Sequence, residues 1–481
     1  MDSEAEEPVQ TELPLFNEFE LCAQAVDEAA PEEEIIVEKK IKKKTPGGRC
    51  ALPKSLPRTV MMHDLSKEEK LCHCGHEMKA MGEVVSETLD YQPAKLTVIE
   101  HRCKKYACSH CADLHKEDRK GEEEEKSKSP LKTAKKPAQL LPKSIATPSL
   151  LTQIAIQKFC YHLPLYRQEA IFRQCGVALS RQVMSQWMLK VSEAVIPLIN
   201  LLQESILSYD VAYADETTLQ VLNEPGRKAQ TTSYMWCFIG GPANARAHIY
   251  QYHETRKGEI AKTFFCDYQG ALHCDGYTGY NALLTHKNVV GINCMAHVRR
   301  KFFEALPGGK MKGVSGQCMR YIQALYAIEE KLRAAQASAL EIKSTRQSES
   351  RPILAEFKSY LDEKANTVLP KSPVGVGVDY TLKRWAYLTT YIADGRYEID
   401  NNRAERAIKP FVVGRKNWLF SNTPKGAHSS ARLFTLIETA KANGQTPELY
   451  LNHIFKKLPF CSRVEDYEAL LPWNLKAETV S

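Results

Sequence analysis

Residues 234–252 read YMWCFIGGPANARAHIYQY, and this stretch decides which kind of fold the chain can form. Both halves are rich in aromatic and β-branched residues, as is typical of β-strands. Gly240, Gly241 and Pro242 lie between the halves and favour a turn. We therefore predict a hairpin of two strands, over residues 234–239 and 247–252.

The flanking sequence predicts further strands and helices around this hairpin. An apolar run begins at Ser208, a helix is expected near 256–266, and strands are expected near 270–275 and 289–293. A helix over about 295–305 follows. Residues of about 314–365 and 380–393 are helical in composition. Strands followed by helices, with a helical block inserted, predict an α/β core.

Helices are also expected on either side of this core. Residues 147–207 have a helical period, with Gly176 in a short turn and Ser180 as the cap of the next helix. This pattern fits a helix-turn-helix or an ordinary pair of packed helices. After the core, Asp400 can cap a helix that ends at Lys409, because Pro410 follows. Residues 430–457 predict one or two more helices.

Composition limits the class of protein. A chain of 481 residues exceeds one hydrophobic core, so two or more domains are expected. It has no apolar run of about 18 residues, and its acidic N-terminus lacks a signal-peptide pattern, so we expect an intracellular protein without a membrane segment. The net charge of +7 barely favours nucleic acid by itself.

Two close cysteine pairs predict a structural Zn²⁺ site. They flank a compact segment that contains an expected strand at 95–98. Four thiolates from two turns can form the tetrahedron that zinc requires, with no position left open for catalysis. The pairs are Cys72 with Cys74 and Cys108 with Cys111; Cys103, His73, His76 and His110 are possible substitutes. Buried cysteines without a metal are the alternative.

Three carboxylates are candidates for a site that binds Mg²⁺ or Mn²⁺. Asp215 and Asp275 end apolar runs, and Glu405 lies on the helix that follows Asp400. Phosphoryl transfer can use two divalent cations held by such oxygens. Acidic residues also terminate strands and cap turns, and Glu216, Glu398 and Asp400 are rival carboxylates.

Basic residues around Glu405 and just after His297 suit a DNA backbone. We expect DNA contacts from Arg299, Arg300, Arg403, Arg406, Lys409, Arg415 and Lys416. A surface ion pair between Glu405 and Lys409 is the simpler interpretation for that part of the helix. A lone histidine such as His297 is more often structural than chemical.

Longer stretches around these residues resemble the transposases of the IS66 family of bacterial insertion sequences. The resemblance covers residues of about 14–458. Its most specific parts are EIDNNRAERAIKPFVVGRKNWLF at 398–420 and DGYTGYN at 275–281; ADET at 214–217, KYACSHC at 105–111 and LFTLIETAKANG at 433–444 also match. Thr218, Met295 and Cys50 stand where relatives usually have Pro, Trp and a basic residue. Relatives also begin with a longer coiled-coil segment, so we expect a shortened N-terminus.

The resemblance implies a DDE transposase with an RNase H-like catalytic core. Asp215 would lie on its first strand, Asp275 on its fourth and Glu405 on its closing helix. The expected organisation is a disordered segment (1–58), a zinc module (59–115), a linker (116–143), a helical DNA-binding region (144–207), a catalytic domain (208–412) with a helical insertion at about 305–390, and a helical tail (413–481).

The resemblance also implies partners and a reaction. Metal-activated water would cut the element end, and the freed 3′-hydroxyl would attack target DNA. Terminal inverted repeats and target DNA would be the substrates of a homo-oligomer, helped by small accessory proteins, in the bacterial cytoplasm at the nucleoid. Two alternatives are a catalytically inactive or domesticated DNA-binding protein and an RNase H-like nuclease.

Overall fold

The computed structural model describes residues 96–107, 131–134 and 136–475. The chain divides into two compact units, residues 1–95 and 96–481, and every described residue belongs to the second. Among the described residues, no helix is long and apolar enough to cross a membrane. The small antiparallel sheet of β1 (Lys105–Ala107) and β2 (Leu131–Thr133) places a strand within the expected linker.

The strand expected at 95–98 is wrong for the residues that the structure describes there. Residues 96–98 have no regular structure, and Val98 is 97% exposed. Alternating side chains stabilise a strand when one face is buried, and this segment has no buried face.

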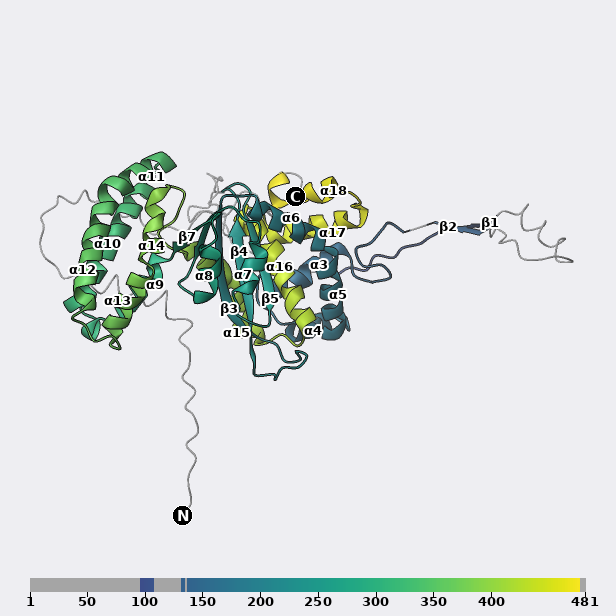
Figure 1. Cartoon of the computed structure of the whole chain (residues 1–481). Helices are drawn as coiled ribbons and strands as arrows, with labels where there is room; N and C mark the ends of the chain where they lie inside the picture. Colours follow the sequence, from purple (N-terminus) through teal and green to yellow (C-terminus); the bar gives the residue numbers. More distant parts are fainter. Residues whose placement is uncertain (1–95, 108–130, 135, 476–481) are drawn as a thin grey trace, which may run out of the picture. The chain divides into compact units, whose positions relative to one another are not determined.

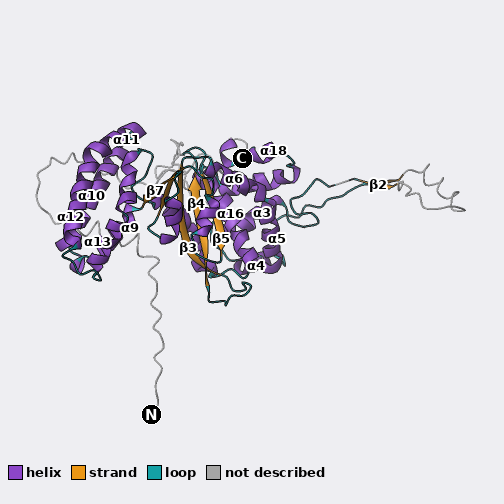
Figure 2. Ribbon diagram, in the orientation of Figure 1, coloured by secondary structure: helices purple, strands orange, loops and turns teal. Residues whose placement is uncertain are grey.

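A five-stranded mixed sheet forms the centre of the described unit (Figure 1). In chain order the strands are β3 (Val211–Gln220), β4 (Thr232–Gly240), β5 (Ala247–His253), β6 (Gly270–Cys274) and β7 (Val289–Asn293). Their spatial order is β5-β4-β3-β6-β7, with β3, β4 and β5 antiparallel and β3, β6 and β7 parallel. The predicted hairpin of β4 and β5 is confirmed. Figure 2 shows the strands in orange among helices in purple.

Helices α3 (Pro148–Phe159), α4 (Leu165–Gln174), α5 (Arg181–Ala194) and α6 (Ile196–Leu207) precede the sheet. Gly176 has a φ of +79°, which favours glycine, and Ser180 Oγ accepts a hydrogen bond from the Val183 amide at 3.4 Å. The predicted turn and helix cap are therefore confirmed. Helices α7 (Glu259–Phe264), α8 (Asn281–Leu284) and α9 (Met295–Glu304) lie between and after the later strands.

A helical unit follows α9, and its apolar side chains form a second hydrophobic core together with residues of α9 and of the sheet, among them Ala271 and Ile292. It contains α10 (Gly313–Ala334), α11 (Ala339–Thr345), a π-helical turn (Arg346–Ser350), α12 (Arg351–Ala365), α13 (Pro373–Lys383) and α14 (Trp385–Thr389). Arg346 is buried at the π-helical turn, where it pairs with Glu329 at 2.6 Å. It also donates to three backbone carbonyls in the segment 391–397. This arginine therefore ties the helical unit to the chain that leads into the next helix.

Helix α15 (Asn402–Trp418) does not end at Lys409 as predicted. Pro410 lies inside it, although an interior proline costs about 3 kcal/mol or more. Ala407, Ile408 and Phe411 on either side of the proline are buried in the main core, and this packing offsets the cost. The expected start of the tail at residue 413 consequently falls within the helix.

Helix α16 (Pro424–Ala442) covers the edge of β5 and is followed by α17 (Pro447–Lys457) and α18 (Val464–Glu468). Thr435 Oγ1 accepts from the Tyr250 amide at 2.9 Å, and Thr439 Oγ1 accepts from the His248 amide at 3.1 Å. Asn443, which follows the helix, contacts the backbone of Arg246. These side chains occupy backbone groups that an exposed edge strand would offer to another chain.

Replacement of one edge-covering threonine should destabilise the fold. In Thr435→Val the buried Tyr250 amide loses its acceptor, so the free energy of unfolding should fall by about 1–3 kcal/mol in denaturant titrations. Thr285→Val removes a threonine from an exposed position and serves as the control. An equal loss in both variants would contradict the edge-covering role.

Candidate active site

Two of the three candidate carboxylates lie at equivalent positions on neighbouring parallel strands. Val211 pairs with Ala271 and Tyr213 with His273 along β3 and β6. Two residues further along each chain lie Asp215, within β3, and Asp275, directly after β6. Side chains two residues apart point to the same face of a sheet, so Asp215 lies on the face of Tyr213. Parallel strands thus bring both aspartates to one edge.

Helix α15 carries the third carboxylate, Glu405, to this edge. Just before the helix, Asn401 donates from Nδ2 to the Ala214 carbonyl at 3.0 Å, and its amide donates to Cys294 Sγ at 3.1 Å. Within the helix, the guanidinium of Arg403 lies over the Tyr213 ring, 5.1 Å from its centroid. The first turn of α15 therefore packs beside Asp215, although it is remote in sequence.

The charges at this edge interact strongly. Burial raises the pKa of Asp215 well above its ordinary value of 3.8, and the negative charges of Glu216, Glu405 and Asp275 raise it further. A pKa raised by like charges indicates a deficit of positive charge. A bound cation would relieve that deficit. Carboxylate oxygens are also the hard ligands that Mg²⁺ and Mn²⁺ prefer.

The tightest group of potential metal ligands is a different one. Within the described part of the chain, Cys294, His297 and Glu405 form the one such group whose ligand atoms all lie within 4.8 Å of one another. His297 Nδ1 is 3.6 Å from Glu405 Oε1, and Cys294 Sγ is 3.9 Å from the same oxygen. Asp215 and Asp275 do not belong to this group. His297 and Cys294 therefore flank one oxygen of the glutamate.

Glu216 points into surroundings that differ from those of its neighbour Asp215. Its side chain is completely buried, with Arg256 Nη2 2.6 Å from Oε1 and the Tyr280 hydroxyl 2.5 Å from Oε2. Burial and the charge of Asp275 raise its pKa, while Tyr280 and Arg256 lower it. Arg256 also reaches Asp275, at 3.7 Å from Oδ2. Asp275 Oδ1 accepts from the Tyr277 amide at 2.9 Å.

The basic residues expected to contact DNA fall into two groups. Arg403 donates to Glu398, with Nε 3.0 Å from Oε1, and Arg415 donates to the hydroxyl of Thr218 at 2.7 Å. Both side chains therefore have partners within the protein. Arg406, Lys409 and Lys416 on α15 are exposed, whereas Arg299 and Arg300 on α9 are half-buried.

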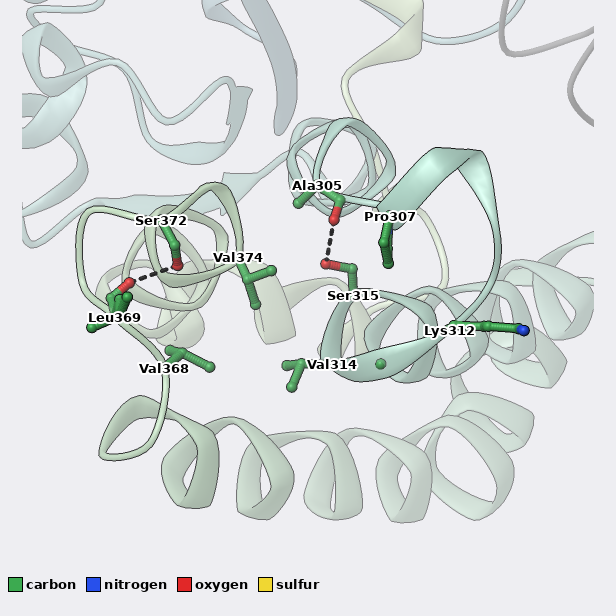
Figure 3. A pocket seen from close by; sticks show the side chains of 10 residues that line it. Ala305, Pro307, Lys312, Val314, Ser315, Val368, Leu369, Ser372 and Val374 are labelled. Atoms are coloured by element: carbon green, nitrogen blue, oxygen red, sulfur yellow. Dashed lines mark hydrogen bonds between the residues drawn. The ribbon is translucent and has the colours of Figure 1, made fainter.

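The expected zinc ligands Cys72, Cys74, Cys108 and Cys111 lie outside the described residues. A pocket of about 330 Å³ lies in the helical unit, away from the carboxylates (Figure 3). Among its polar side chains, Ser315 Oγ donates to the Ala305 carbonyl and Ser372 Oγ to the Leu369 carbonyl. Both hydroxyls already donate hydrogen bonds within the protein, so they are not available as donors to a ligand in the pocket.

Sequence reasoning missed part of this site. It assigned no role to Arg256, Tyr277 or Tyr280, and it treated Glu216 only as a rival of Asp215. The two tyrosines stand in the DGYTGY stretch, which carried a detectable signal. Arg256 is a single arginine in a loop between a strand and a helix, and nothing local distinguishes it.

Family models match most of the chain. The model described as the transposase IS66 family matches residues 143–429, the zinc-finger binding domain of transposase IS66 matches 69–112, and the IS66 C-terminal element matches 435–473. The class is therefore that of transposases. The chain belongs to the IS66 transposase family.

Relatives in Sinorhizobium fredii (strain NBRC 101917 / NGR234) carry no described activity. Uncharacterized protein y4jD is 31% identical over 446 residues, which cover 89% of this chain and 82% of the relative. Uncharacterized protein y4qI is 30% identical, covering 84% of this chain and 74% of the relative. These similarities support the family and add nothing about the reaction.

The raised pKa of Asp215 predicts a pH-dependent effect on stability. The folded protein disfavours the ionised carboxylate, so wild-type stability falls as pH rises from 3.8 through the raised folded pKa. Without metal, Asp215→Asn should therefore melt at a higher temperature than wild type at pH 8, and the difference should shrink toward pH 4. Thermal unfolding in a chelator measures this, with Asp379→Asn on α13 as the control. A wild type at least as stable at pH 8 would contradict the charge argument.

Proposed function

We propose that this transposase cuts DNA at the ends of its element and joins them to target DNA, using divalent cations held by Asp215, Asp275 and Glu405. The observation that carries the proposal is that the parallel pairing of β3 and β6 brings Asp215 and Asp275 to one edge, where α15 carries Glu405 close enough for its charge to raise the pKa of Asp215. Their donor oxygens suit Mg²⁺ or Mn²⁺, and their repulsion favours binding of a cation.

We also infer that the sheet is an RNase H-like core. Asp215 lies on the first of the five strands in chain order, Asp275 directly follows the fourth, and Glu405 lies on a helix after the fifth. These are the positions that the family resemblance implies. The helical unit, Gly313–Ala393, separates α9 from α15 and corresponds to the expected insertion.

The protein's own residues orient the site. The Tyr277 amide holds one oxygen of Asp275, and Asn293 Nδ2 donates to the Asp275 carbonyl at 3.2 Å. His297 and Cys294 flank Glu405 Oε1 and would hold this carboxylate in place. When bound, divalent ions would activate the attacking oxygen and stabilise the leaving one. Exposed Arg406 on α15 would hold the DNA backbone nearby.

The zinc-finger segment and the helices that precede the sheet suit a role in DNA recognition. Cys72, Cys74, Cys108 and Cys111 would bind Zn²⁺ in the segment that the zinc-finger model matches. Helices α4 and α5 would contact the terminal inverted repeats, in a homo-oligomer and with small accessory proteins. A catalytically inactive DNA-binding protein is the second candidate, favoured by the tight group at Glu405 that excludes both aspartates.

Loss of one candidate carboxylate should abolish the chemistry and spare DNA binding. We expect Asp275→Asn to reduce cleavage and strand transfer of DNA carrying the element's ends by about 10³-fold or more in Mg²⁺ or Mn²⁺. Gel-shift binding should persist, and Asp267→Asn on the exposed loop after α7 should remain active. Intact cleavage by Asp275→Asn would disprove the mechanism. Binding without cleavage by the wild type in either metal would favour the inactive protein.

The zinc proposal is tested by metal content. Wild-type protein purified without chelators should contain one zinc per chain, and Cys108→Ser or Cys111→Ser should lose it, because a tetrahedral site needs all four ligands. Elemental analysis gives the ratio, with the buried Cys318→Ser in the helical unit as the matched control. Zinc content that is the same in all four proteins would refute the ligand assignment.

A further inference from the structure

Glu216 has no oxygen left for a metal ion, although it adjoins Asp215. Oε1 accepts from Arg256 Nε at 2.6 Å, with Nη2 of the same guanidinium also 2.6 Å away. Oε2 accepts from the hydroxyl of Tyr280, itself completely buried. A carboxylate with both oxygens engaged and its side chain fully buried is already satisfied. The contribution of Glu216 to the site therefore comes from the side chains that it binds.

What Glu216 holds is a guanidinium that faces the carboxylate cluster. The guanidinium of Arg256 lies over the Tyr277 ring, with Cζ 3.9 Å from the ring centroid, and the Tyr277 hydroxyl donates to the Arg256 carbonyl at 2.5 Å. Nη2 points toward Asp275 Oδ2 at 3.7 Å. Among the described residues, the acceptors of this guanidinium contact Nε and Nη2, and 38% of the side chain remains exposed. None of these acceptors contacts Nη1, which can therefore donate to a ligand.

The guanidinium lies 3.7 Å from Asp275, one of the carboxylates beside which a phosphodiester would be bound. A DNA phosphate that binds beside Asp215, Asp275 and Glu405 brings its own negative charge, and further charge develops on its oxygens during cleavage. An arginine presents a planar set of donors that match phosphate oxygens. Because Glu216 and Tyr277 already fix Arg256, it loses little conformational entropy when it binds.

We propose that Arg256 binds the phosphodiester on which the carboxylates act, and that Glu216 and Tyr277 position it. The inference rests on the proposed function and deepens it. The competing explanation is purely structural: Arg256 would only neutralise the buried charge of Glu216. The two explanations predict different cleavage rates when Glu216 and Arg256 are both replaced by neutral residues.

A double variant separates them. With DNA carrying the element's ends, Arg256→Gln should reduce single-turnover cleavage about 100-fold, the usual effect of losing one donor to a developing charge. Arg256→Lys should recover only a small part, because an ammonium lacks the planar fork of donors with which a guanidinium spans Glu216 and a phosphate in fixed geometry. Glu216→Gln combined with Arg256→Gln should remain as slow as Arg256→Gln. Recovery of the double variant to near wild-type rates would overturn the proposal, and melting curves verify that each variant is folded.

A binding measurement tests the same contact without cleavage. With Ca²⁺ in place of Mg²⁺, the slope of log affinity against log salt for the same DNA should become shallower by about 1 in Arg256→Gln, as for loss of one phosphate contact. Lys358→Gln on α12 removes a positive charge from an exposed ion pair and should leave the slope unchanged. An unchanged slope in Arg256→Gln, or equal changes in both variants, would overturn the proposal. If the wild type fails to cleave DNA at all, the proposed function fails and this slope still decides the role of Arg256.

Discussion

Four carboxylates gather where β6 ends beside the middle of β3, and the negative charge that they concentrate there is the constraint that the surrounding structure must satisfy. Asp215 is affected by the charges of Glu216, Glu405 and Asp275 at once, in a buried setting that strengthens each interaction. Without other contacts, carboxylates that repel one another would turn toward the solvent. They stay because strands, a helix and the guanidinium of Arg256 fix them before any ligand arrives.

The helical unit contributes to this fixation through the start of α15. Tyr326 on α10 donates to Asp400 Oδ2 at 3.0 Å, and the Met295 amide donates to the Ile399 carbonyl at 3.1 Å. Arg346 binds three carbonyls in the segment 391–397 that leads to these residues. The position of Glu405, on the first turn of α15, depends on how firmly that turn is held. The helical unit therefore supports the position of Glu405.

The sequence predicted what depends on local pattern. Aromatic and β-branched composition, apolar runs and turn residues located β4, β5, β6 and β7, and the ends of apolar runs pointed to Asp215 and Asp275. The predicted helix end before Pro410 was wrong because the packing of Ala407 and Phe411 outweighs the local preference of proline. This packing depends on the tertiary fold. Arg256 escaped because its importance arises from contacts with Glu216 and Asp275, which are distant in sequence and close only after the sheet forms.

The neighbouring residues Asp215 and Glu216 show how strand register determines which carboxylate lies on which face of the sheet. Successive side chains of a strand point to opposite faces, so one residue faces α15 and Glu405 while the next faces Arg256 and Tyr280. The pairing of Tyr213 with His273 fixes this choice, and their rings stack with centroids 4.4 Å apart. A slip of one residue would exchange the two carboxylates and separate Asp215 from Asp275. Burial of both faces of β3 thus specifies the composition of the site as well as the stability of the sheet.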